Sequence, residues 1–207
     1  MESQWHPQLI QQGIFNPCSF CHDEGMNELI LPNSNKLYFV IGGQAATERL
    51  LDLAARLAIQ GRLLILDCGN RANPLPLVRE LRRLTHDPVR ALGNIQMARA
   101  FTCYQVTALL EGQANQPIQQ PVLIFDLLAT FYDESVPYRE GCRLLEQSLG
   151  YMTHIRQSAP LLASSRPPPA EYPERISFLE MVCNQSDVLW AEEAPELPQP
   201  RQLSFLS

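Results

Sequence analysis

Short apolar runs alternate with segments of helical periodicity along most of the chain. The run KLYFVIGG (36–43) is partly β-branched and aromatic and ends in glycines, which predicts a buried strand. Residues 45–60 then place leucine and alanine at helical spacing until Gly61 stops the pattern. By the same criteria, further strands are predicted over 62–69, 93–101, within 121–131, over 159–165 and over 186–193, and further helices over 74–84, 104–112 and 139–157.

Strands that alternate with helices at this spacing predict an α/β fold of the doubly wound class. In such a fold a mostly parallel sheet carries helices on both faces, so its strands are apolar throughout. The 207 residues, 45% of them hydrophobic, suffice for one sizeable core. We therefore expect a core domain over 36–192, preceded by a polar N-terminal arm (1–35).

The last residues, 193–207, are predicted to form a Pro-rich tail. Prolines at 195, 198 and 200 favour an extended tether, and the tail ends in the apolar stretch RQLSFLS. The chain contains no run of about 18 apolar residues, and its first residues lack the layout of a signal peptide. We expect a cytoplasmic protein with no membrane partner.

The cysteines change this expectation little. Several of the six lie in apolar or helical patterns, which suits reduced thiols. The stretch CSFCH places Cys18, Cys21 and His22 at the spacing of a c-type haem attachment site, but that chemistry needs an exported chain, and a zinc site needs a second ligand pair. A loop with two thiols is the preferred interpretation, the role of these residues stays open, and no cofactor or metal is expected.

The formal net charge of −6 argues against a protein that coats nucleic acid through its overall field. The basic residues comprise fifteen arginines and a single lysine, Lys36. Gly42, Gly43, Asp67 and Asp126 all fall at the carboxyl ends of predicted strands. Ligands of doubly wound folds bind at this edge, so these residues form the candidate site.

Two stretches resemble the RecA superfamily, and more closely the archaeal and eukaryotic strand-exchange recombinases and their paralogues. GNIQMARAFTCYQVTALLE (93–111) has the family's Asn, short strand, Ala-Arg-Ala-Phe and polar helix start. PVLIFDLLATFYDE (121–134) is similar to the Walker B strand, with Asp126 at the position of the metal-side carboxylate. The resemblance covers roughly 36–192 and implies a RecA-like core.

The departures from that family concern the groups that act on ATP. Aligned from Gly42, the phosphate loop has Thr47, Glu48 and Arg49 where the family has Gly-Lys-Thr/Ser, and the chain's one lysine precedes the strand. A carboxylate at the lysine position repels polyphosphate at close range.

The family also has a catalytic carboxylate shortly after its second strand, where this chain has Cys68, Gly69 and Asn70. We therefore expect a pseudo-ATPase, not an enzyme, whose loop keeps its fold without its chemistry. The degenerate nucleotide site would comprise Gly42, Gly43, Thr47, Glu48, Arg49, Asp67 and Asp126.

Each of these residues also has a simpler interpretation. The glycine pair can serve only as a strand-to-helix turn, and Asp126 can cap neighbouring N–H groups instead of holding a metal. Arg99 is interpreted as a structural ion-pair partner in preference to a DNA contact. His154 is interpreted as a surface or packing residue.

The segment that corresponds to the family's DNA-binding loop, YDESVPYREGC (132–142), is short. Arg139, Arg143, Arg156 and Arg166 remain near that face and can hold phosphate, although solvated helix charges are the commoner case. Contact with DNA is therefore expected to be weak or indirect.

The resemblance implies a non-catalytic recombinase paralogue that supports DNA recombination or repair by binding a recombinase or another replication or repair protein. The alternative is an ATPase with an atypical or partner-completed nucleotide site. A third possibility is a scaffold related to the clock or signalling ATPases of the superfamily, against which the Ala-Arg-Ala-Phe stretch argues. In the tail, Gln202, Leu203, Phe205 and Leu206 resemble the peptide by which bacterial polymerases and repair factors bind the sliding clamp; alternatively these side chains cover the domain itself.

Overall fold

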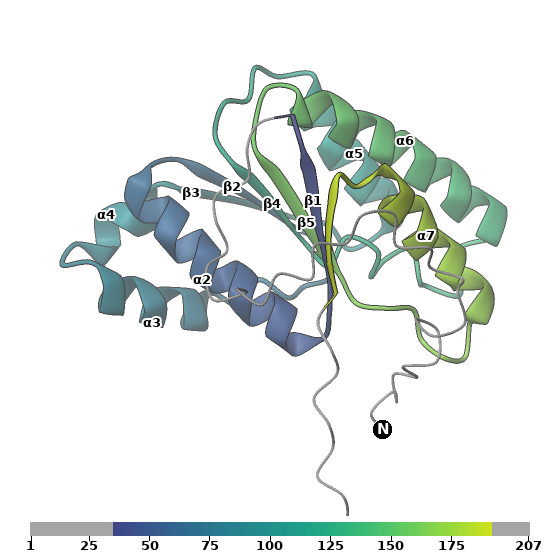
Figure 1. The fold of residues 1–207 in the computed structure, drawn as a ribbon, viewed down its shortest axis with the longest axis horizontal. Helices are drawn as coiled ribbons and strands as arrows, with labels where there is room; N and C mark the ends of the chain where they lie inside the picture. The colour runs from purple at the N-terminus through teal and green to yellow at the C-terminus, as the bar shows by residue number, and fades with distance from the viewer. Residues whose placement is uncertain (1–34, 192–207) are drawn as a thin grey trace, which may run out of the picture.

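A six-stranded parallel sheet lies at the centre of the computed structural model, which describes residues 35–191 (Figure 1). Its strand order is β3-β2-β4-β5-β1-β6, and every neighbouring pair is parallel. The strands are β1 (Leu37–Ile41), β2 (Leu63–Asp67), β3 (Ile95–Arg99), β4 (Val122–Phe125), β5 (Leu161–Ser165) and β6 (Val188–Ala191). The predicted α/β doubly wound fold is confirmed, and the arrangement is consistent with a RecA-like fold.

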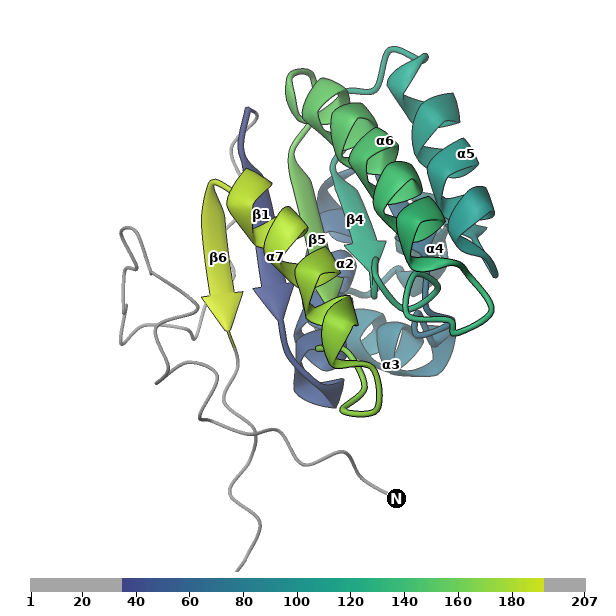
Figure 2. The same cartoon turned by 90° about the vertical axis from the view of Figure 1, so that its right-hand side faces the viewer.

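Helices cover both faces of the sheet. They are α2 (Gln44–Gln60), α3 (Pro74–Leu84), α4 (Pro88–Gly93), α5 (Cys103–Ala114), α6 (Tyr138–Arg156) and α7 (Ile176–Gln185), the last preceded by a 3₁₀ turn, η1 (Pro173–Arg175). Figure 2 shows α5, α6 and α7 in front of the sheet, with α2, α3 and α4 behind it. No helix within residues 35–191 is long and apolar enough to cross a membrane.

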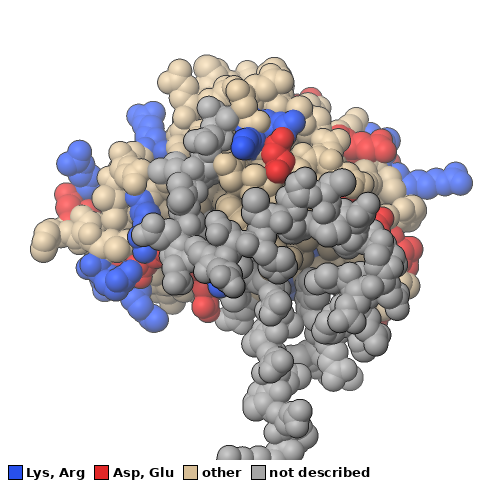
Figure 3. All heavy atoms as spheres, viewed as in Figure 1, with Lys and Arg blue, Asp and Glu red and all other residues tan. Residues whose placement is uncertain are grey.

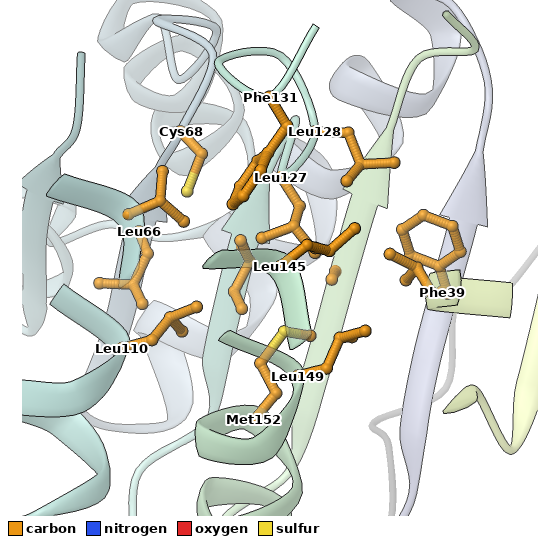
Figure 4. Packing of buried hydrophobic residues seen from close by; sticks show 14 of the residues in the cluster. Phe39, Leu66, Cys68, Leu110, Leu127, Leu128, Phe131, Leu145, Leu149 and Met152 are labelled. Carbon is orange, nitrogen blue, oxygen red and sulfur yellow. The ribbon is translucent and has the colours of Figure 1, made fainter. Parts of the chain in front are cut away.

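The sheet divides the core into two clusters because successive side chains of a strand point to opposite faces. In β1, Phe39 packs with α5, α6 and α7, whereas Val40 packs with α2 and α3. Figure 4 shows Leu145, Leu149 and Met152 of α6 within the cluster that contains Phe39. Every residue of β2, β4 and β5 is buried, which explains why these strands read as continuous apolar runs.

Two local features differ from the sequence pattern. The apolar run 121–131 ends as a strand at Phe125, because Asp126 adopts a left-handed backbone (φ 52°) that turns the chain out of the sheet. Leu127, Leu128 and Phe131 remain buried, so their hydrophobicity reflects the core and not a longer strand. The pattern predicts neither α4 nor α7. In α4, six residues are too few to show a period, and the Asp87 side chain caps the helix by accepting from the N–H of Arg90.

Candidate functional site

Asp67 is a fully buried carboxylate at the carboxyl end of β2, with 0% of its surface exposed. One oxygen accepts from the backbone N–H of Arg71 at 2.8 Å. The other accepts from the N–H of Ala72 at 3.2 Å and from Nε of Arg99 at 2.9 Å. Arg99 ends the neighbouring strand β3 and stands opposite Asp67 in register, so the expected ion-pair role of Arg99 is confirmed.

Asp126 is the second buried carboxylate and follows β4, the strand next to β2. Its Oδ1 accepts from the backbone N–H of Arg166 at 3.1 Å, and its Oδ2 accepts from Nε of the same arginine at 2.8 Å. Nε of Arg71 lies 3.7 Å from Oδ2, so Arg71 touches both carboxylates, one through its backbone and one through its side chain. Three arginines therefore balance two buried negative charges.

The left-handed backbone of Asp126 is held by β5. Its N–H donates to Oγ of Ser164 at 3.2 Å, and the next N–H, of Leu127, donates to the carbonyl of Ser164 at 2.8 Å. Aspartate tolerates this conformation better than most residues do. The carboxylate is thus fixed by both its own backbone and its partners.

Gly69, two residues after β2 ends, packs against the Asp126 side chain that follows β4. A Cβ at this position would lie 2.5 Å from Oδ2 and 2.6 Å from Cβ of Asp126, closer than real side chains approach. In the recombinase resemblance a catalytic carboxylate follows this strand. At Gly69 the present backbone admits no side chain of any kind unless Asp126 moves.

Two further ionisable side chains, Cys68 and Tyr132, lie close to these carboxylates and have raised pKa values. Burial, and then the charges of Asp67 and Asp126, raise the pKa of the Cys68 thiol. Burial likewise raises the pKa of the Tyr132 hydroxyl, which donates to the carbonyl of Arg166 at 3.3 Å. Neither group is a nucleophile at neutral pH, because the thiolate and phenolate are the reactive species.

The connection between β1 and α2 differs from the expectation. It consists of Gly42 and Gly43 alone, since the helix begins at Gln44. Thr47, Glu48 and Arg49 lie within α2, in agreement with the helix predicted over 45–60. The two-residue connection is too short for a phosphate loop, so the expectation that such a loop keeps its fold here is wrong. The N–H of Gly42 donates to the carbonyl of Ser165 at 3.1 Å, which makes the glycine pair a tight strand-to-helix turn.

The arginines considered for DNA binding do not form one surface. Arg139 and Arg143 lie in the first turns of α6, and Arg156 ends that helix, about 20 Å from Arg143 at 1.5 Å per residue. Arg143 pairs with Glu140, Arg156 pairs with Asp187, and Arg166 belongs to the Asp126 pair. Of these four arginines, only Arg139 forms no ion pair with another residue between 35 and 191. His154 is exposed on α6, as expected.

Some predicted residues lie outside the described range. These are Cys18, Cys21 and His22 of the arm and Gln202, Leu203, Phe205 and Leu206 of the tail. Between residues 35 and 191, no group of three or more His, Cys, Asp or Glu side chains comes together as a metal site.

Sequence reasoning missed the partners of Asp126. The sequence gives no indication that Arg71 contacts Asp126, and it suggests only phosphate binding for Arg166. The available signal was weak: each arginine follows closely after a buried strand, and the carboxyl ends of parallel strands share one edge.

No protein-family model matches the chain, and no curated protein matches it significantly in sequence. The recombinase resemblance therefore stays a prediction.

Proposed function

We propose that this protein is a non-catalytic RecA-like accessory factor of DNA recombination or repair, which acts by binding another protein and does not hydrolyse ATP. The observation that carries the proposal is the state of Asp67 and Asp126. Asp67 already accepts from two backbone N–H groups and from the Arg99 side chain. Asp126 accepts from the backbone N–H and from the side chain of Arg166.

Phosphoryl transfer needs free carboxylates at this edge, because a carboxylate must hold or orient Mg²⁺ and another group must position the attacking nucleophile. Releasing Asp126 for a metal would break its hydrogen bonds with the backbone N–H and with Nε of Arg166. Gly69, packed on Asp126, leaves no space for a second acid. The network thus favours a structural use of residues that serve ATP in the resembling family.

The β1–α2 connection supports the same conclusion. A phosphate loop surrounds the phosphates with successive backbone N–H groups, and two residues are too few to do so. Glu48 follows within the second turn of α2, where its charge opposes a polyphosphate at the helix start.

A fold of this kind that does not act on ATP can still function by binding a partner protein. The tail residues indicate the first candidate partner. The order Gln202, Leu203, Phe205, Leu206 offers an amide and three apolar side chains, the chemistry that inserts into an apolar pocket with a polar rim. The sliding clamp of the host is therefore the partner to test first, and its strand-exchange recombinase the second.

The test measures binding of the full chain to each purified host protein by surface plasmon resonance. The matched control is the triple variant Leu203→Ala, Phe205→Ala, Leu206→Ala, beside peptides of residues 196–207 with and without these changes. We expect wild-type binding to the clamp in the micromolar range or tighter and at least a tenfold loss in the variant. Equal or absent binding of both peptides rejects the clamp, and absence of binding to clamp and recombinase alike rejects the proposed function.

A further inference from the structure

Charge is divided unequally between the two halves of the described chain. Residues 52–99, which include most of α2 and all of α3, α4 and β3, carry eight arginines against four carboxylates, a net charge of +4. Residues 100–191, which include α5, α6 and α7, carry five arginines against ten carboxylates, a net charge of −5. Figure 3 shows basic side chains gathered at the end of the molecule where Figure 1 places α3 and α4.

The centre of this positive half is a surface formed by Arg79, Arg82 and Arg83 of α3 and Arg90 of α4, here called the α3–α4 basic surface. Leu77 and Leu81 turn one side of α3 into the core, which leaves the arginines on the opposite side, all exposed. Arg83 pairs with Glu80. Within residues 35–191, no carboxylate forms an ion pair with Arg79, Arg82 or Arg90, so three cations are available to a ligand.

Two exposed aliphatic side chains interrupt the arginines. Leu75 is 70% exposed one turn before Arg79, and Val89 is 77% exposed beside Arg90. A nucleic-acid backbone uses cationic and polar donors but has little use for aliphatic contacts, whereas a polypeptide buries them. The surface therefore fits an acidic polypeptide that also carries large apolar side chains.

The chain itself contains such a segment. Residues 1–34 have four carboxylates and no lysine or arginine. Three of those carboxylates, Asp23, Glu24 and Glu28, fall in FCHDEGMNE (20–28), together with Phe20 and Met26. We propose that residues 20–28 bind the α3–α4 basic surface of the same molecule, independently of the function proposed above.

The length of chain permits this contact. The described chain starts at Asn35, whose N–H donates to the carbonyl of Arg156 before β1 begins. Crossing from β1 to the edge strand β3 takes four strand spacings, about 19 Å. Residues 28 and 20 precede Asn35 by seven and fifteen positions, which in extended form span about 24 and 50 Å. The acidic segment can therefore reach α3 and α4 without leaving its own molecule.

The single lysine makes the proposal testable by cross-linking. A carbodiimide joins an amine to a carboxylate in direct contact, and arginine does not react, so R82K introduces one new reactive amine on the surface while keeping its charge. R139K, at an exposed position of α6, is the matched control. Lys36 and the N-terminal amine react equally in both full-length variants and serve as the internal standard.

We expect mass spectrometry of the monomer to locate a cross-link between position 82 and Asp23, Glu24 or Glu28. Its yield should exceed that of any link from position 139 to the same carboxylates at least fivefold. It should fall at least fivefold at 1 M salt, where the Debye length is about 3 Å. Adding R79E and R90E to R82K should lower the yield similarly while all acceptor carboxylates remain, and far-UV circular dichroism checks that this variant is folded.

Three results overturn the proposal. Equal yields from positions 82 and 139 mean that the segment does not prefer the basic surface. A cross-link that appears only in the dimer assigns the surface to a second copy of the chain. Tight binding of a dT30 oligonucleotide by the wild type, abolished by R79E/R82E and not by R139E/R143E, assigns it to nucleic acid.

Discussion

Replacing Asp67 by alanine separates a structural carboxylate from one held ready for a ligand. The substitution removes the acceptor of the N–H groups of Arg71 and Ala72 and of the Arg99 side chain. Each buried N–H left without a partner costs about 1–3 kcal/mol. The Arg99 side chain is 35% exposed, so losing its ion pair adds about 1 kcal/mol or less. We expect Asp67→Ala to lower the free energy of unfolding by about 3 kcal/mol in total.

The measurement is urea unfolding of both single variants and of the double variant Asp67→Ala, Arg99→Ala. With a slope near 2 kcal/mol per molar urea, Asp67→Ala should lower the midpoint by about 1.5 M. Arg99→Ala alone should cost about 1 kcal/mol, because the backbone N–H groups keep their acceptor. A coupling energy of about 0.5–1.5 kcal/mol is expected for two groups in direct contact.

An Asp67→Ala variant that is as stable as the wild type, or more stable, would contradict a structural role of Asp67. Carboxylates kept for catalysis or metal binding are held at a cost to the fold, so their removal commonly stabilises a protein. Such a result would show that the donors around Asp67 find other partners, and the network could not be regarded as structural.

Three further predictions concern packing, pH and DNA. Gly69→Ala forces a Cβ against Asp126 and should lower the free energy of unfolding in urea by about 1–3 kcal/mol. Gly150→Ala, in open space on α6, should raise it by about 0.5–1 kcal/mol. Equal effects of the two substitutions would contradict the contact between Gly69 and Asp126. Burial raises the pKa of Cys183 to about 12, and also raises that of Cys68. Unfolded thiols ionise near pH 8.5, so the free energy of unfolding should be constant below about pH 8.5 and fall as the pH rises toward 12. The fall should be less steep in Cys183→Ala. A free energy of unfolding that increases from pH 8.5 to 10 would contradict this prediction. Binding to single-stranded DNA should be weak and fall steeply with salt in a fluorescence anisotropy titration, and nanomolar affinity at physiological salt would contradict this expectation.

The order of the six strands and of α2, α3, α5 and α6 could be predicted from the sequence because periodicity and buried runs report it directly, whereas α4 and α7 were not predicted. The helix expected over 74–84 matches α3 at both ends, since Pro74 follows the capping residue Asn73 and the leucines mark the buried side. Asp126 follows β4 as expected, but apolarity alone does not mark the end of this strand, because Leu127 and Leu128 are as apolar as the strand before them. What stops the strand is the conformation of Asp126, which depends on contacts with Ser164 that lie 38 residues away.

The sequence predicts where the candidate site lies but not which side chains contact one another there. Asp67, Asp126 and the glycine pair fall at the expected edge because parallel strands share their carboxyl ends. The pairing of Asp126 with Arg166 could not be predicted, since it joins residues 40 positions apart. The helical pattern over 45–60 predicts the start of α2 to within one residue, whereas the alignment to a phosphate loop assigns a loop to residues that are helical from Gln44.

The most direct test of the central claim is isothermal titration of the full chain with ATP in the presence of Mg²⁺. Because the buried carboxylates are engaged by arginines and the β1–α2 connection is only two residues long, we expect no binding tighter than about 1 mM, equivalent to about −4 kcal/mol. A dissociation constant in the low micromolar range, about −8 kcal/mol, requires a working phosphate site and would contradict the claim.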